Sequence, residues 1–352
     1  MKPKAVVAMS GGVDSSVAAY LMKEQGYDVT GIMLKLWKGA AANNESGCCS
    51  VDAAEDARRV AQLLDIPFYV FNFADEFERT VIANFKSEYS RGRTPNPCVE
   101  CNRSIKFHAL LDRARKVGAS TLATGHYAQV DQRGGQYLLK QSVDRDKDQS
   151  YVLYMLTQDE LSSARFPVGL FDKTEIRGIA ESLGFRNANK ADSQEICFVP
   201  DGDSHKFLAD NVPEGSQRGQ IVDDTGGVVG THRGFAHYTL GQRRGLGVAK
   251  KFPVYVRKID ADTNTITIAQ KDQMTATSIN VSQVNFISGH YPPETRAEVV
   301  TRYRGPRSWA TVTKTHAGYR VEFDFPADLA APGQAAVFYQ DEVVIGGGTV
   351  DD

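Results

Sequence analysis

Along the first 130 residues, short apolar runs rich in β-branched side chains alternate with stretches whose apolar positions recur at helical spacing. Four apolar runs predict strands, at residues 5–9, 29–34, 67–73 and within 119–128. Four other stretches predict helices, at residues 17–25, 51–64, 76–89 and 105–117. Strands and helices that alternate in this way form right-handed crossovers, so we expect a parallel sheet covered by helices on both faces.

The pattern is helical again from 159 to 183 and changes in character after about residue 215. From there, short alternating runs are separated by Asp, Asn and Gly turns, as at residues 222–229, 259–269, 317–323 and 339–348. This texture predicts two β-rich modules with a boundary near 271–278. We therefore expect an α/β protein with a Rossmann-like domain at 1–205, a small β domain at 206–274 and a second β domain at 275–352.

Composition narrows the class of protein further. A chain of 352 residues with 41% apolar and 24% charged side chains fits a globular protein of several domains. No apolar run approaches the roughly 20 residues of a membrane helix, and the first residues begin a folded element instead of a targeting signal. Five cysteines are too few and too unevenly spaced for a secreted disulfide framework, so we expect a cytoplasmic protein with reactive or metal-binding thiols.

A glycine-rich loop, Ser10-Gly-Gly-Val-Asp-Ser-Ser16, lies between the first predicted strand and the first helix. Its paired glycines let the backbone approach an anion, and the following helix offers unpaired N–H groups and the positive end of its dipole. The loop lacks the Gly-Lys-Ser/Thr of a Walker A motif and the G-x-G-x-x-G of a dinucleotide site. A plain strand-to-helix turn is the alternative, but seven such positions together indicate a phosphate site.

Three cysteines stand near other reactive signals. Cys98 and Cys101 follow the proline-rich Thr94–Pro97 and precede a predicted helix, and Arg91, Arg93, Arg103 and Lys106 are close in sequence. A helix N-terminus and basic neighbours both favour a thiolate. Cys197 follows far downstream. The three could be buried structural thiols, ligands of zinc or an iron–sulfur cluster, or a pair that relays sulfur by thiol exchange.

Six motifs occur in one order along the chain: TPNPCVECN, TGHYA, KDQSY, DSQEICFV, GQRRGLG and PGQAAVFY. With the loop SGGVDSS, which resembles the PP-loop of ATP pyrophosphatases, they make the chain similar to the tRNA-specific 2-thiouridylases from Ala5 to Gly348. The resemblance implies that ATP adenylates O2 of the wobble uridine and that sulfur then replaces this oxygen. It implies a persulfide on Cys197, Cys101 as nucleophile, a resulting Cys101–Cys197 disulfide and a C-terminal β-barrel.

The resemblance also implies a set of binding residues. Those expected at ATP are Ala8, Met9, Ser10, Gly11, Gly12, Val13, Asp14, Ser15, Ser16, Met33 and Gly125, with Asp14 also helping to place Mg²⁺. Those expected at tRNA are His126, Lys147, Asp148, Gln149, Arg243, Arg244, Arg302, Tyr303, Arg304 and Gln334. The implied partners are tRNAs that accept Glu, Gln or Lys, and a cysteine desulfurase or sulfur-relay protein.

Charge supports an RNA-facing surface in the small β domain. The net charge of the chain is −2, which argues against indiscriminate nucleic-acid binding, yet residues 231–258 hold seven Lys or Arg and no Asp or Glu. Strand alternation is expected to divide these residues between faces. A uridine within a folded anticodon stem-loop is out of reach of a buried thiolate, so we expect the base to be flipped out.

One residue departs from the family pattern. Many members carry Asp where this chain has Cys98, which cannot do carboxylate chemistry in the same way. Cys98 also supplies a third thiol, which raises the iron–sulfur alternative, although we favour the persulfide relay. Cys48 and Cys49 are adjacent in a predicted loop and are interpreted as structural or incidental. The alternatives in other classes are a different adenylating PP-loop enzyme, such as an amidating one, and a non-catalytic tRNA-binding protein.

Overall fold

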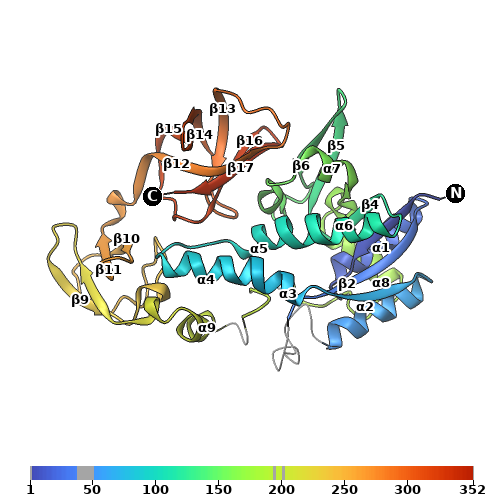
Figure 1. Ribbon diagram of the computed structural model, residues 1–352, viewed down its shortest axis with the longest axis horizontal. Coiled ribbons are helices and arrows are strands. Elements are labelled where there is room, and N and C mark those ends of the chain that lie inside the picture. The colour runs from blue at the N-terminus through green and yellow to red at the C-terminus, as the bar shows by residue number, and fades with distance from the viewer. Residues whose placement is uncertain (1, 38–50, 193–195, 200–202, 352) are drawn as a thin grey trace.

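The computed structural model describes residues 2–37, 51–192, 196–199 and 203–351. Figure 1 shows an N-terminal α/β region, a small β region beside α9 and a C-terminal β region above α4 and α5. Cys48 and Cys49 lie outside the described residues. The expected class, a parallel-sheet domain followed by two β-rich ones, is confirmed.

The N-terminal sheet has the strand order β3-β2-β1-β4-β7, and every pairing in it is parallel. Its strands are β1 (Lys4–Ala8), β2 (Asp28–Lys35), β3 (Phe68–Asn72), β4 (Thr121–Thr124) and β7 (Ala164–Arg165). Successive residues of β1 enter different cores, since Val6 packs in one cluster and Ala5 and Val7 in another. The chain reverses its winding between β1 and β4, and such switch points are where ligands bind in open α/β sheets.

Helical segments surround this sheet, except that the last of them, α9, lies beside the small β region (Figure 1). In chain order they are α1 (Val13–Glu24), α2 (Val51–Leu63), α3 (Ala74–Phe77), η2 (Glu78–Ile82), α4 (Ala83–Ser90), α5 (Pro97–Glu100), η3 (Cys101–Leu110), α6 (Leu111–Lys116), η4 (Ser150–Leu153), α7 (Gln158–Ser163), η5 (Pro167–Leu170), α8 (Lys173–Ser182) and α9 (Ser204–Asn211). The segments η2 and η3 are π-helical and continue their α-helical neighbours without a break. The helix predicted at 51–64 corresponds to α2, and those predicted at 76–89 and 105–117 correspond to the continuous segments 74–90 and 97–116.

Two sequence predictions in this domain were wrong in detail. The stretch 159–183 is not one helix, because β7 and the η5 turn that begins at Pro167 separate α7 from α8. A β-hairpin, β5 (Ala128–Arg133) and β6 (Gln136–Gln141), was missed, although Gly134 and Gly135 at its turn both have positive φ.

The small β domain contains a four-stranded sheet of order β10-β11-β8-β9. Its elements are η7 (Glu214–Ser216), β8 (Gly219–Val222), β9 (Val228–His232), η8 (Phe235–His237), β10 (Tyr255–Asp260), β11 (Thr265–Ala269) and η9 (Lys271–Gln273). The β10–β11 register shifts between Val256 and Lys258, which places Arg257 and Lys258 both at the surface instead of on opposite faces.

The C-terminal domain is a closed six-stranded antiparallel barrel, as expected. Its strands are β12 (Thr275–Phe286), β13 (Glu294–Val300), β14 (Ser308–Thr315), β15 (Gly318–Asp328), β16 (Ala335–Gln340) and β17 (Val343–Val350), and the pairing of β12 with β17 closes it. The hairpin β5–β6 joins this sheet through β6 and β17, so the barrel is attached to the N-terminal domain by backbone hydrogen bonds. Within the described residues, no helix is long and apolar enough to cross a membrane.

Candidate active site

The glycine-rich loop follows β1 and opens α1 at the switch point of the sheet. Gly11 has a φ of +77°, and a Cβ there would lie 2.3 Å from the carbonyl oxygen of Ala53, so only glycine fits. Gly12 is the N-cap of α1 and makes no side-chain capping bond. The hydroxyls of Ser15 and Ser16 each donate to the carbonyl of Gly12 at 3.0 Å. The first-turn N–H groups thus remain available to an anion.

Asn187, from a distant part of the chain, hydrogen-bonds to this loop. Its Nδ2 donates to the carbonyl of Gly11 and to the hydroxyl of Ser16, both at 3.0 Å, and its side chain is buried. Its Oδ1 is buried and has no hydrogen-bond partner among the described residues. Sequence reasoning missed Asn187, because it lies 176 residues from Gly11 in an unremarkable polar segment.

Asp14, in the first turn of α1, is at the centre of a charge network. Its Oδ1 accepts from the hydroxyl of Tyr127 and from Nζ of Lys173, both at 2.8 Å. Nζ of Lys173 also lies 2.7 Å from Oδ1 of Asp192, and Nζ of Lys147 lies 2.7 Å from Oδ2 of the same carboxylate. Burial raises the pKa of Asp192, but hydrogen bonds from Lys147 and Lys173 outweigh it and lower the pKa to about 2.

Tyr127 remains a hydrogen-bond donor in this network. Burial, and next the negative charge of Asp14, raise the pKa of Tyr127 far above its ordinary value of 10.0. The ring of Tyr127 also lies 5.7 Å below Nζ of Lys173. The network therefore joins the loop after β1, the segment after β4, the start of α8 and the segment that leads to Cys197.

The expected adenosine positions lie at the same edge of the sheet. Gly125 follows β4, and a Cβ there would lie 2.7 Å from the backbone nitrogen of Ser15. Glycine is thus required for packing β4 against the loop, a role that sequence reasoning did not assign. The side chains of Met9, Val13 and Met33 are buried in the core, so only their main chains can reach a ligand.

Cys98 and Cys101 lie at the start of a continuous helix that begins at Pro97, eight residues before the predicted start. Asn96 is its N-cap, and its side chain accepts a hydrogen bond from the backbone nitrogen of Cys98 at 3.1 Å. Cys98 is exposed in the first turn, whereas Cys101 is buried one turn later. The expectation that Cys101 lies near a helix N-terminus is confirmed.

The basic residues near Cys101 in sequence are engaged elsewhere. Arg91 and Arg93 both pair with Glu88, and Arg103 pairs with Glu100. Lys106 approaches the imidazole of His126. The charges of the three arginines are therefore largely compensated by carboxylates, and the helix N-terminus remains as a positive dipole end near Cys101.

Cys197 is exposed in a segment anchored on both sides. Upstream, Asp192 is held by Lys147 and Lys173. Downstream, the buried ring of Phe198 packs against four aromatic rings, those of Trp37, Phe77, Phe85 and Phe207, with centroids 5.2–6.4 Å away. The thiol is thus at the surface of the domain, on a segment tied to the phosphate loop through Asp192 and Lys173.

The sequence raised two metal groups, a cluster held by the cysteines and Mg²⁺ at Asp14. Among the described residues, no group of three or more His, Cys, Asp or Glu side chains is placed to hold a metal ion. Asp14 has the carboxylate chemistry that Mg²⁺ prefers, and its Oδ2 contacts Lys173 at 2.9 Å.

Comparisons with known proteins cover the whole chain. Residues 3–201, 205–270 and 276–350 match the family models described as "tRNA methyl transferase HUP domain", "tRNA methyl transferase PRC-barrel domain" and "Aminomethyltransferase beta-barrel domain". The tRNA-specific 2-thiouridylase MnmA of Clostridium perfringens is 45% identical over 356 residues, which cover 99% of each chain. The tRNA-specific 2-thiouridylase MnmA of Heliobacterium modesticaldum is 47% identical over 99% of this chain and 93% of its own. This chain belongs to the tRNA-specific 2-thiouridylase family.

Solved structures give a weaker likeness. A 4-thiouridine synthetase–RNA complex with bound ATP aligns with a TM-score of 0.38 and 20% identity, over 60% of this chain and 51% of that one. That level of similarity is too low to bear on function.

The thiouridylase family pattern places four candidate tRNA contacts beside the active site, and all four side chains are used inside the protein. Asp148 is buried and accepts from the amide and hydroxyl of neighbouring serines. Gln149 accepts from the backbone of Tyr127, and Lys147 holds Asp192. Burial, and next the charge of Lys106, hold the pKa of His126 well below 6.5, so its imidazole is neutral at pH 7.

The other candidate tRNA contacts of this chain lie in the β domains and are mostly exposed. Arg243 and Arg244 are exposed, and Arg243 lines an open hollow of about 430 Å³. Arg302, Tyr303 and Arg304 are exposed on the barrel, where the Arg304 guanidinium lies 5.2 Å from the Tyr303 ring. Gln334 is different, because its Nε2 donates to the carbonyl of Thr94 at 2.7 Å.

Proposed function

We propose that this protein is an ATP-dependent tRNA-uridine 2-sulfurtransferase that converts the wobble uridine of tRNA to 2-thiouridine. One observation carries the proposal. A glycine-rich loop at the switch point of the sheet and the cysteines Cys101 and Cys197 occur in a chain that matches 2-thiouridylases over 99% of its length.

In the first step, O2 of the uridine attacks the α-phosphate of ATP, and pyrophosphate leaves. The loop from Ser10 to Ser16 holds the phosphates through uncapped N–H groups of α1 and through serine hydroxyls. When ATP enters, Lys173 would break its ion pair with Asp14 and pair with the phosphate oxygens instead. Asp14 would then hold Mg²⁺, which neutralises charge on the leaving pyrophosphate when bound.

In the second step, Cys197 carries the outer sulfur as a persulfide, Cys197–S–SH. The thiolate of Cys101 attacks the inner sulfur of Cys197, which forms the Cys101–Cys197 disulfide and releases hydrosulfide. Hydrosulfide attacks C2 of the adenylated uridine, and AMP leaves with the former O2. The two thiols have supplied two electrons to the outer sulfur, so a thiol reductant must reduce the disulfide before the next cycle.

The exposure of the two cysteines fits this division of labour. Cys197 is exposed, so a persulfide donor protein, such as a desulfurase or relay protein, can reach it. Cys101 is buried, which protects a nucleophile that must act only inside the closed site. The target base would be flipped out of the anticodon loop to meet it, and tRNAs for Glu, Gln and Lys are the expected substrates.

RNA would contact the exposed basic residues of both β domains. Arg243 and Arg244 lie in the stretch 231–258, whose sequence contains no Asp or Glu. Tyr303 offers a ring for stacking on a base. The methyl transferase wording of two family models names a different reaction. A methyl transfer needs neither a phosphate-binding loop nor a relay of two cysteines, so we favour thiolation.

The test is a thiolation assay on unmodified tRNA with ATP and a persulfide donor, run anaerobically with iron measured on the same samples. It compares wild type with Cys98→Ser, Cys101→Ser and Cys197→Ser. We expect iron-free activity that Cys101→Ser and Cys197→Ser abolish and Cys98→Ser retains. Activity that needs stoichiometric iron and all three thiols would replace the relay with a cluster. Thiolation that persists without Cys101 or Cys197 would overturn the mechanism.

A further inference from the structure

The segment that leads to Cys98 and Cys101 is held by the C-terminal barrel. The backbone nitrogen of Thr94 donates to the carbonyl of Pro332 at 2.8 Å, and Nε2 of Gln334 donates to the carbonyl of Thr94 at 2.7 Å. Both backbone polar groups of Thr94 are therefore satisfied by a loop about 240 residues away in sequence. We call these contacts, together with those of Arg93 below, the barrel anchor.

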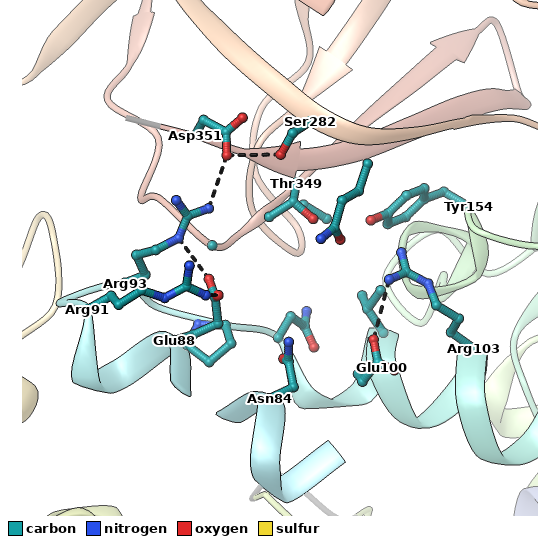
Figure 2. A pocket seen from close by; sticks show the side chains of 16 residues that line it. Asn84, Glu88, Arg91, Arg93, Glu100, Arg103, Tyr154, Ser282, Thr349 and Asp351 are labelled. Carbon is teal, nitrogen blue, oxygen red and sulfur yellow. Dashed lines mark hydrogen bonds and ion pairs between the residues drawn. The ribbon is translucent and has the colours of Figure 1, made fainter. Parts of the chain in front are cut away.

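Arg93 adds a charged connection at the same place. Its Nε donates to Glu88 of α4 at 2.7 Å, and its Nη2 donates to the carbonyl of Val350 at 2.9 Å. The same Nη2 lies 3.3 Å from Asp351, which also accepts from the hydroxyl of Ser282 (Figure 2). The Arg93 side chain is only 16% exposed, so these interactions are poorly screened by solvent.

Close packing fixes the segment as well. Gly333 has a φ of +88°, and a Cβ there would lie 3.2 Å from the backbone of Thr94. On the other side, a Cβ on Gly92 would lie 2.9 Å from the side chain of Ile259 in the small β domain. The segment is thus packed between the two domains that carry the candidate RNA-binding residues.

A short rigid path connects the barrel anchor to the catalytic thiol. Thr94 is followed by Pro95, Asn96 and Pro97, and the two prolines fix φ on either side of the N-cap. The side chain of Asn96 caps the helix at Cys98, and Cys101 lies one turn further. The segment between Thr94 and Cys101 therefore has few backbone torsions free to absorb a displacement.

The pocket beside the anchor, of about 200 Å³, does not offer free charge to RNA. Its arginines are each paired with a carboxylate in its wall, Arg91 and Arg93 with Glu88, and Arg103 with Glu100 (Figure 2). The amide of Gln334 is likewise spent on Thr94. Of these side chains, Arg93 and Gln334 make the contacts that join the N-terminal domain to the barrel.

We propose that Gln334 and Arg93 are positioning residues that fix the Cys101 helix to the barrel, so that sulfur transfer depends on how the barrel is docked. This goes beyond the thiolation proposed above, on which it rests, and it gives Gln334 a role other than contact with tRNA. A barrel that engages tRNA would thereby set the position of the nucleophile.

The test compares Gln334→Ala and Arg93→Met with Gln340→Ala, a matched control in which a barrel glutamine amide donates to the carbonyl of Arg296 at 3.2 Å. We expect the single-turnover rate of thiolation at saturating tRNA to fall roughly 10- to 100-fold in both variants, because small misplacements of reacting groups have effects of that size. Pyrophosphate release and tRNA affinity should stay near wild type, as should every property of Gln340→Ala.

Hydrogen exchange makes the test independent of the reaction. We expect faster exchange in Gln334→Ala and Arg93→Met at the amides of residues 98–104, and unchanged exchange in the β1–α1 region. A weaker tRNA affinity with unchanged exchange and single-turnover rate would make Gln334 an RNA ligand and overturn the proposal. If the wild type does not thiolate tRNA, the proposed function is contradicted. Hydrogen exchange in the two variants would still decide whether the barrel anchor exists.

Discussion

The ammonium group of Lys173 lies 2.8 Å from Oδ1 of Asp14, in the first turn of the phosphate-loop helix. The same ammonium lies 2.7 Å from Asp192, and only 11% of the Lys173 side chain is exposed. A buried cation between two carboxylates has no excess charge to attract an anion. If ATP binds at the loop as proposed, its triphosphate brings several negative charges to this point, and the position of Lys173 should respond to it.

Replacing Lys173 should therefore impair adenylation more than tRNA binding. We expect Lys173→Met to lower the rate of tRNA-dependent pyrophosphate release by about 100-fold, the usual effect of losing one donor to transition-state charge. Lys190→Met is the matched control, because Lys190 pairs with Asp56 on the same domain. An unchanged rate in Lys173→Met, measured with folded protein, would remove Lys173 from the ATP site.

Gly125 provides a steric test of the same site. A methyl group there would meet the backbone of Ser15 at 2.7 Å and push β4 away from the loop, so we expect Gly125→Ala to weaken ATP binding at least tenfold. Gly178, within α8, is the control, since a Cβ there has no atom within 4 Å. Gly178→Ala should raise the free energy of unfolding by up to about 1 kcal/mol and leave ATP affinity unchanged. Titration calorimetry measures the ATP affinity, and urea titration measures the free energy of unfolding.

The Asp192 carboxylate predicts how stability depends on pH. Its pKa is about 2 in the folded protein and 3.8 in an ordinary environment, so its contribution is fully present above pH 4 and is lost as the pH falls towards 2. A shift of this size corresponds to about 2 kcal/mol at most, and partial exposure reduces it to about 1 kcal/mol. Asp192→Asn should lack this contribution.

Urea unfolding of both proteins between pH 2.5 and 6 isolates the effect. The difference in unfolding free energy between wild type and Asp192→Asn should be constant above pH 4 and shrink below it. A difference that stays constant throughout this range would show that Asp192 titrates normally in the folded protein.

Local signals in the sequence predicted the parts of the site that are contiguous. The loop from Ser10 to Ser16 was found because its turn, glycines and following helix are adjacent. Asn187 and Lys173 were missed because each reaches the loop from more than 150 residues away, and neither carries a local motif. Only the fold brings them together.

The same limit applies to the meaning of single residues. Gly125 was expected at adenosine, and the structure gives it a packing role against Ser15. Gln334 was expected at tRNA, and its amide is bound to Thr94. A sequence shows that a position is special, but the identity of its neighbour depends on chain segments that meet only after folding.

The exposed arginines of the small β domain give a prediction that depends on salt. If Arg243 and Arg244 each neutralise one phosphate, each Ala substitution should lower the slope of log Kd against log salt concentration by about 0.7 to 1. Arg59→Ala is the control, because Arg59 is also exposed but pairs with Glu55 on α2. Filter binding measures the slopes between about 50 and 300 mM salt, a range that spans physiological ionic strength. Slopes that match wild type in both variants would place the RNA elsewhere, and the barrel residues Arg302 and Arg304 would then be tested in the same way.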